Sequence, residues 1–385
     1  MRVAAVLASL LLCGRFKAQE RQSSALGPDT ESLIASVKSA VGQAYLSGDQ
    51  FTQIRETLLR WIDTWIKQGK SQNEINRELR DAGLIDRREL PRDEVLKSFI
   101  GYLAEAKVQP LSGGEDILQV RLGIGMTCGY DETVVLYRRQ PFARIGILNE
   151  FEPSHPIAQR YTSIVIGPRD SRGRRIVAAG AVSLWCTSTY VGAVLRLESL
   201  QDSCMRTLLK RAVAARIWDD AAVVRASVEG NVATFLYQAS LPDGELMSRK
   251  AIARYSISGE QVRREPPIAL SRIGFIDEWL MMDDREAVRW STPNAAKRHR
   301  DLSAWVANKP FEYWKTWLCS GSPSRWEVVI NPLKDPTERR VFLLAEAGAN
   351  KMKMLKVSKE SLSGCREMGL PGLAADLGWQ LGQGR

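Results

Sequence analysis

Four acidic side chains within one short segment are the residues best suited to catalysis in this chain of 385 residues. They are Asp277, Glu278, Asp283 and Asp284. A glycosidase uses two carboxylates that flank one cleft, and this segment could supply such a pair. Adjacent acids on a helix more commonly form a solvated face, which is the competing interpretation of Asp283 and Asp284. A secreted hydrolase that uses carboxylates near Asp277–Asp284 is therefore the alternative function, not the leading one.

Other common catalytic motifs are missing from the sequence. It contains no GxSxG nucleophile elbow and no SxxK, HExxH or Walker motif. The only histidines are His155 and His299, too few for a zinc cluster or much histidine acid–base chemistry. His299 is flanked by Arg298 and Arg300, and we expect these cations to disfavour its charged form. We predict no catalytic residue, no cofactor and no metal.

Tryptophan is concentrated in the last third of the chain, where six of the 11 residues of this type lie between positions 279 and 326. Most of these rings should be buried, because tryptophan contributes a large apolar area. Trp314 and Trp317 are three positions apart in an expected strand, so they should face opposite sides and at least one should be exposed. An exposed tryptophan beside arginine can stack on a sugar or a peptide group. We predict a binding surface formed by Arg289, Trp290, Trp314, Trp317, Arg325 and Trp326.

The six cysteines indicate how the chain is cross-linked. They are Cys13, Cys128, Cys186, Cys204, Cys319 and Cys365. In an oxidising compartment most of the mature cysteines should be paired. The favoured disulfide is Cys319–Cys365, which would close the last domain, and the second is Cys186–Cys204. Cys128 then remains as the free thiol.

The N-terminus has the features of a secretory signal peptide at residues 1–18. A positive start precedes an apolar run over residues 3–12, and polar chain follows. Two alternatives are a lipoprotein anchored through Cys13, although Leu12 stands where a small residue is expected, and a retained N-terminal helix. Cleavage after Ala18 removes three cations and no acid, so the formal charge falls from +10 to +7. We expect a secreted or periplasmic protein without a transmembrane segment in its mature chain.

The amino-acid composition limits the kinds of partner that the protein is expected to bind. Charged residues make up 25% of the chain and apolar residues 44%, which is typical of a folded soluble protein and excludes general disorder. The basic excess favours anionic partners such as cell-surface polymers or phospholipid headgroups. Outside the cytoplasm nucleic acid is not expected, and the predicted partner is a cell-envelope protein or glycan. No oligomeric state is predicted.

The N-terminal part, residues 30–108, is predicted to be a helical module. Ile54, Leu58 and Ile62 recur at helical spacing and form one apolar stripe. Ser71 and Glu74 have the spacing of a capping box, in which each side chain binds the backbone amide of the other residue.

The remaining chain is predicted to form two further domains. Residues 115–270 alternate in strand fashion and carry hairpin sequences such as Ser258-Gly259-Glu260, which indicates antiparallel sheet. Residues 271–370 combine a helix over 273–290, a second helix towards Asn308 and four strands.

The predicted fold class is thus α+β. It consists of the helical module, a β-rich middle (sandwich, open barrel or propeller-like) and a small C-terminal α+β unit of two helices on a curved sheet. The leading functional hypothesis is a non-catalytic binding or structural protein of the cell envelope that holds a polymer or protein partner. A role confined to assembly in a larger complex is consistent with the same features.

Overall fold

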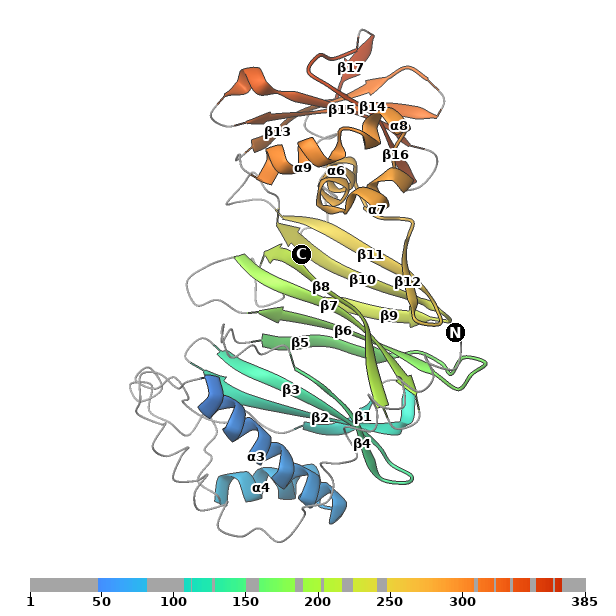
Figure 1. The fold of residues 1–385 in the computed structure, drawn as a ribbon. Coiled ribbons are helices and arrows are strands. Elements are labelled where there is room, and N and C mark those ends of the chain that lie inside the picture. The colour runs from blue at the N-terminus through green and yellow to red at the C-terminus, as the bar shows by residue number, and fades with distance from the viewer. Residues whose placement is uncertain are drawn as a thin grey trace. The chain divides into compact units, whose positions relative to one another are not determined.

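The computed structural model describes fourteen stretches of the chain (Figure 1). These are residues 48–81, 107–111, 113–126, 129–149, 159–183, 190–201, 204–216, 224–240, 248–307, 311–321, 323–332, 335–346, 351–362 and 364–368. The predicted signal peptide at 1–18 lies outside them. The chain divides into two compact units, residues 1–188, 196–210 and 228–230, and residues 189–195, 211–227 and 231–385.

The described structure consists mostly of antiparallel sheet with a few helices, which confirms a β-rich α+β fold. The strands form a four-stranded, an eight-stranded and a five-stranded sheet. None of the described helices is both long and apolar enough to cross a membrane.

In the first unit, two helices pack on the four-stranded sheet. The helices are α3 (Gly48–Lys67) and α4 (Gln72–Asp81), and the strands are β1 (Lys107–Leu111), β2 (Gly114–Met126), β3 (Gly129–Arg138) and β4 (Ala143–Leu148), in the order β1-β2-β3-β4. The predicted stripe on α3 is buried against alternate residues of β2, including Val120 and Leu122. The capping box is also present, because the Ser71 amide donates to Glu74 Oε2 over 2.7 Å and the Glu74 amide donates to Ser71 Oγ over 3.4 Å.

The eight-stranded sheet contributes to both units. Its strands are β5 (Gln159–Ile166), β6 (Arg175–Ser183), β7 (Tyr190–Gln201), β8 (Cys204–Arg216), β9 (Arg225–Glu229), β10 (Val232–Ser240), β11 (Ser248–Ser258) and β12 (Gln261–Glu265). The order is β12-β11-β10-β8-β7-β6-β5, with β9 paired to β10. The predicted hairpin at Gly259 joins β11 to β12, and glycine is favoured there because φ is +65°.

The second unit ends in four helices and a five-stranded sheet. The helices are α6 (Arg272–Met281), α7 (Asp284–Arg289), α8 (Pro293–Ala296) and α9 (His299–Ala307). They are followed by β13 (Phe311–Cys319), β14 (Ser324–Pro332), the 3-10 turn η3 (Pro336–Glu338), β15 (Arg340–Glu346), β16 (Met352–Ser358) and β17 (Cys365–Glu367). The sheet order is β16-β15-β14-β13-β17, and one sheet face packs against the helices through residues such as Val328 and Phe342.

Two features of this region differ from the sequence prediction. The single helix expected over 273–290 is divided into α6 and α7, and four short helices replace the two that were predicted. The division arises because Asp283 Oδ1 accepts the Glu286 amide over 2.8 Å and so starts a new helix. The sheet also gains a fifth strand, β17, opposite the end of β13.

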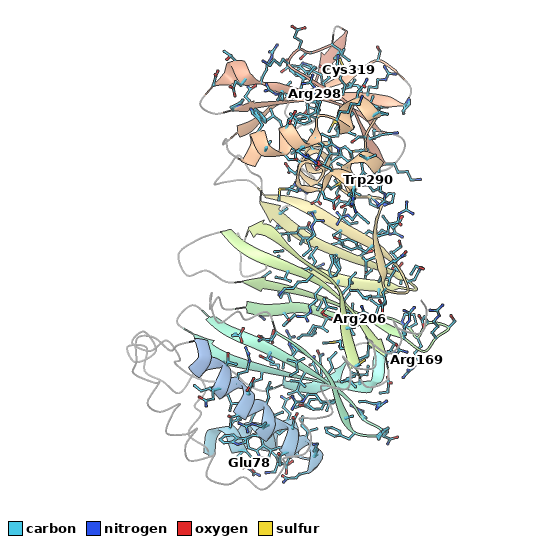
Figure 2. All side chains as sticks on the ribbon, viewed as in Figure 1. Glu78, Arg169, Arg206, Trp290, Arg298 and Cys319 are labelled. Carbon is cyan, nitrogen blue, oxygen red and sulfur yellow. A yellow bond between two sulfur atoms is a disulfide. The ribbon has the colours of Figure 1, made fainter. Side chains whose placement is uncertain are left out.

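The favoured disulfide is confirmed. Cys319 on β13 and Cys365 on β17 stand directly opposite each other and are bonded. Cys204 is also in a disulfide, whereas its predicted partner Cys186 and the predicted free thiol Cys128 lie outside the described residues. Figure 2 marks Cys319 among the side chains.

Candidate functional site

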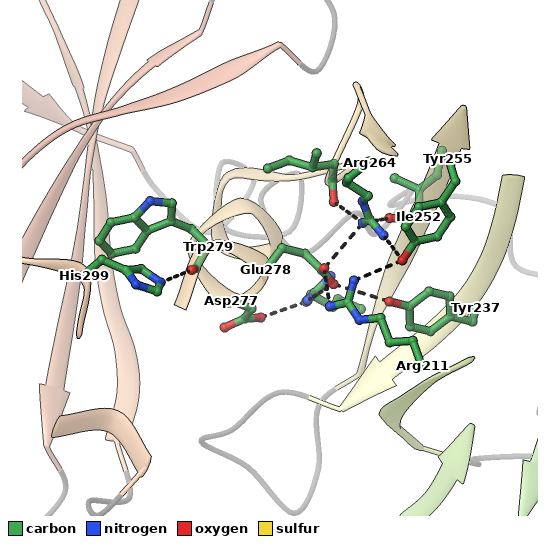
Figure 3. Close-up of polar contacts among 11 residues, drawn as sticks. Arg211, Tyr237, Ile252, Tyr255, Arg264, Asp277, Glu278, Trp279 and His299 are labelled. Carbon is green, nitrogen blue, oxygen red and sulfur yellow. Dashed lines mark hydrogen bonds and ion pairs between the residues drawn. The ribbon is translucent and has the colours of Figure 1, made fainter. Parts of the chain in front are cut away.

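The four acids proposed for catalysis lie on or beside α6 and α7, and two of them enter a buried charge cluster (Figure 3). We call this set the arginine–glutamate cluster. It comprises Arg211, Arg249, Arg264, Asp277 and Glu278. Asp277 and Glu278 are only 6% and 4% exposed although both are acidic. Burial at this level requires ionic partners, because an isolated buried charge is strongly unfavourable.

Three guanidinium groups provide those partners. Arg211 Nη2 lies 3.1 Å and Arg264 Nη2 3.4 Å from Glu278 Oε2. Arg249 Nε donates to Asp277 Oδ2 over 2.7 Å, and its Nη2 lies 3.5 Å from Glu278 Oε1. Each acid is therefore held in place by at least one arginine from a strand distant in sequence.

Strand alternation brings the arginines to one face of the sheet. Tyr255 on β11 is paired with Ala233 on β10 and with Arg264 on β12, while Arg249 on β11 is paired with Ala239. The small alanines leave room for the long side chains next to them. Gly274 on α6 serves the same purpose, since a Cβ there would lie 3.0 Å from Arg249 Nη1.

Two tyrosines complete the surroundings of Glu278. Tyr237 donates its hydroxyl to Glu278 Oε1 over 3.3 Å, and the Tyr255 hydroxyl accepts from Arg264 over 3.1 Å. Burial raises the pKa of Tyr237 and the Glu278 charge raises it further, so this phenol is a neutral donor.

Glu278 is held as a carboxylate. Burial alone would raise its pKa, but the guanidinium groups of Arg264, Arg211 and Arg249 outweigh burial and keep the pKa below its ordinary range. The same pairing raises the pKa of Arg211, although burial acts in the opposite direction. A carboxylate that is buried and ionised at neutral pH cannot serve as a general acid there, and Glu278 is too enclosed to reach a substrate.

The other two acids have structural contacts as well. Asp283 caps α7. Asp284 accepts from His299 Nδ1 over 2.8 Å and from Arg300 Nη2 over 2.6 Å. The hydrogen bond from His299, followed by that from Arg300, lowers the pKa of Asp284.

His299, Asp284 and Ser303 are arranged in an order that resembles a serine nucleophile with its base. Ser303 Oγ lies 3.3 Å from His299 Nε2, but this nitrogen lies closer, at 2.7 Å, to the carbonyl oxygen of Trp279. The Ser303 hydroxyl donates instead to the Leu280 carbonyl oxygen over 2.8 Å, so it is not arranged to give its proton to His299. His299 is flanked by Arg298 and Arg300 in the sequence, and in the structure its ring also contacts the Asp284 carboxylate. The ring links α6, α7 and α9.

Glu286 is a further acid of this region, not predicted from the sequence. It lies half-buried on α7, and its Oε1 has no hydrogen-bond partner among the described residues. Burial raises its pKa, Arg264 and Arg211 lower it less, and Asp283 raises it further. The only sequence signal for its position is its capping-box spacing from Asp283.

We predict that Glu286→Gln stabilises the protein at neutral pH. A carboxyl whose pKa is raised in the folded state contributes stability that is present below its unfolded pKa, about 4.3, and that is lost as pH rises through the folded pKa. The neutral glutamine removes this loss, so the Tm at pH 7.5 should rise by a few degrees and the Tm at pH 4 should stay unchanged. Thermal unfolding at the two pH values measures this, with the exposed Glu229→Gln as control. An equal or lower Tm at pH 7.5 would contradict it.

The residues predicted to form one binding surface do not all lie on the same surface of the structure. Trp326 is buried in the core that faces the helices, and the Arg272 guanidinium lies 3.3 Å from the centre of its ring. Trp290 is partly buried at the end of α7, with the Arg289 guanidinium 5.4 Å from its ring centre. The structure therefore places Trp326 and Trp290 against the apolar core.

Trp317 and Arg325 lie on the other face of the five-stranded sheet. Trp317 is paired with Glu327, and Arg325 is paired with Cys319. Because side chains alternate along a strand, these four side chains lie on the sheet face opposite to Trp326. Arg325 is exposed and Trp317 is half-buried. Trp314 lies at a register shift in β13, and its side chain is outside the described residues.

Comparisons with known proteins do not identify a family. No protein-family model matches the chain, and no curated protein matches it. Among solved structures, the chain is similar to xylan β-1,4-xylosidase from Bacillus halodurans C-125 at 8% identity, with a TM-score of 0.21, over 68% of this chain and 47% of that one. It is also similar to the xyloglucan PUL GH43B protein of Bacteroides ovatus at 10% identity, with a TM-score of 0.15, over 66% and 55% of the two chains. The chain thus spans about half the length of these proteins. Likenesses of this size carry no argument about function.

Proposed function

We propose that the protein is a non-catalytic binding or structural protein of the cell envelope that holds a glycan or protein partner. One observation carries the proposal: each of the four acids best placed for catalysis is already engaged in an ion pair, a helix cap or both. Such engagement supports a structural role for α6 and α7. The alternative is a hydrolase that uses carboxylates in this segment.

The binding surface of the proposal retains two of the residues predicted from the sequence, Trp317 and Arg325, at its centre. An exposed guanidinium and a half-buried indole on one sheet face support it, because such a pair can bind a sugar ring or a peptide by stacking. Arg289, which is exposed and stacked on Trp290, would form a second contact point.

The proposal includes an extracytoplasmic location, secreted or periplasmic, reached through cleavage of residues 1–18. The Cys319–Cys365 disulfide supports it, since disulfides persist mainly in oxidising compartments. Anchoring through Cys13 is the lipoprotein alternative. The finer domain plan, with a helical module at 30–108, a β domain at 115–270 and an α+β domain at 271–370, is part of the same proposal.

A binding assay on isolated cell envelopes tests the function. We expect Trp317→Ala and Arg325→Ala to weaken sedimentation of the protein with envelopes at least tenfold, whereas Arg263→Ala, an exposed arginine of another sheet, should have no effect. Asp283→Asn, which retains the ability to cap a helix, and Asp284→Asn should bind as well as the original protein. Release of soluble sugar or peptide that is lost in these two asparagine variants would favour the hydrolase instead.

A further inference from the structure

An open hollow of about 470 Å³ lies in the first unit, on residues of β1, β2 and β5. Its volume is within the range of small-molecule sites. Polar residues predominate in its lining, which includes Gln109, Gln119, Arg121, Thr162 and Ser163. Pro110 and Ile164 add apolar surface.

The strand register explains why these groups converge. Gln109 on β1 stands directly opposite Gln119 on β2, and Arg121 is two residues further along the same strand. These side chains therefore share the face of the sheet opposite to Val120 and Leu122, which pack against the helices. On β5 the register with β6 shifts between Tyr161 and Ser163, an irregularity of the kind that redirects side chains at binding sites.

Two buried polar atoms of lining residues have no hydrogen-bond partner in the described part of the chain. They are Gln119 Oε1, an acceptor, and Arg121 Nε, a donor. Gln119 as a whole is only 5% exposed. Native structures rarely leave such groups unsatisfied, and one explanation is a ligand that supplies the missing partners. A hydroxyl group can both donate to the first atom and accept from the second.

The local charge favours a neutral ligand. Arg121 Nη2 donates to the buried Glu132 carboxylate over 2.8 Å and also contacts the Tyr161 carbonyl oxygen. Glu132 additionally accepts the Tyr161 amide over 2.7 Å. The Glu132 carboxylate already balances the Arg121 charge. The hollow therefore offers hydrogen bonds to a ligand but no unpaired positive charge that would attract an anion.

We propose that this hollow binds a neutral sugar unit of a glycan. Gln119 Oε1 and Arg121 Nε bind its hydroxyl groups, while Pro110 and Ile164 contact the carbon face of its ring. The inference rests on the proposed function, since it names neutral glycan as the partner that the protein holds.

Calorimetric titration with three tetrasaccharides tests the proposal. The probes are cellotetraose, chitotetraose and tetragalacturonate, which represent a neutral, a neutral N-acetylated and an acidic chain. We expect at least one neutral probe to bind more tightly than the acidic one. Gln119→Met should weaken that binding at least tenfold, because methionine keeps the length of the side chain and removes the acceptor.

Stability provides an independent readout on the same variant. Gln119→Met should retain or raise the Tm, since it removes a buried acceptor without a partner, and Gln238→Met, at an exposed site in the second unit, should leave both Tm and binding unchanged. If Gln119→Met does not fold, Gln109→Leu takes its place with the same expected loss of binding.

The proposal is overturned if no neutral probe binds, if tetragalacturonate binds most tightly, or if the Gln119 variant binds as well as the original. Envelope sedimentation separates this failure from that of the proposed function. A protein that sediments with envelopes but binds no neutral probe refutes only the sugar site, whereas a protein that does neither refutes both.

Discussion

Glu278→Gln is expected to lower the free energy of unfolding by about 3–5 kcal/mol at pH 7, the usual effect of removing one partner from a buried ion pair. Glutamine has nearly the same shape but no charge. The substitution therefore removes the carboxylate that pairs with Arg211, Arg249 and Arg264, and it leaves the Asp277–Arg249 pair in place. Denaturant unfolding followed by circular dichroism measures the loss.

The pH dependence of this loss has a definite sign. The pKa of Glu278 is lowered in the folded state, so its contribution to stability is present above the unfolded pKa, about 4.3, and is lost as pH falls through the folded pKa. The difference between the original protein and the variant should therefore shrink between pH 7 and pH 3.

Glu346→Gln is the matched control for this substitution. Like Glu278, Glu346 is paired with arginine, but it has a single partner, Arg272, over 3.1 Å, and its side chain is 23% exposed. We expect Glu346→Gln to lower the free energy of unfolding by less than about 1 kcal/mol. An equal loss in the two variants would mean that the arginine–glutamate cluster does not hold α6 in place.

Replacing Cys319 and Cys365 together with alanine is expected to lower the free energy of unfolding by about 2–4 kcal/mol. The disulfide closes a loop with a sequence separation of 46 residues, and its loss gives the unfolded chain more freedom. Without the disulfide, β17 depends on its backbone pairing with β13 to stay at the edge of the sheet. Reduction of the original protein by dithiothreitol should produce a similar loss in an unfolding experiment.

A double serine variant adds a second comparison at this site. A carboxylate oxygen of Glu327 and both sulfur atoms lie within 4.8 Å of one another, and Glu327 Oε2 has no hydrogen-bond partner among the described residues. Serine hydroxyls at positions 319 and 365 could donate to the Glu327 carboxylate, so the serine variant should be more stable than the alanine variant. Identical stabilities would show that Glu327 takes no part in the site.

Local sequence was sufficient to predict those structural elements that depend on residues close to one another in the chain. The apolar stripe of α3, the Ser71–Glu74 capping box and the Gly259 hairpin were all predicted, because each depends on residues within a few positions of one another. The Cys319–Cys365 disulfide was also predicted, because a bond between these two cysteines would close the last domain.

The environment of the acidic side chains could not be predicted from the sequence and is known only from the tertiary structure. Glu278 meets Arg211, Arg249 and Arg264, which lie 67, 29 and 14 residues away. No local pattern indicates that three strands will direct these guanidinium groups towards α6. The sequence showed that carboxylates were present, but only the fold decided that they are neutralised.

The same distinction applies to the aromatic and amide residues. The interleaving of tryptophan and arginine near the C-terminus can be read from the sequence, and so can the strand character of the region that contains Gln119. The positions of these side chains in the fold cannot: Trp326 is buried under Arg272 while Trp317 and Arg325 lie on the opposite face, and Gln119 lines a hollow with β5. Alternation along a strand fixes which residues share a face, whereas what covers each face depends on packing between distant segments.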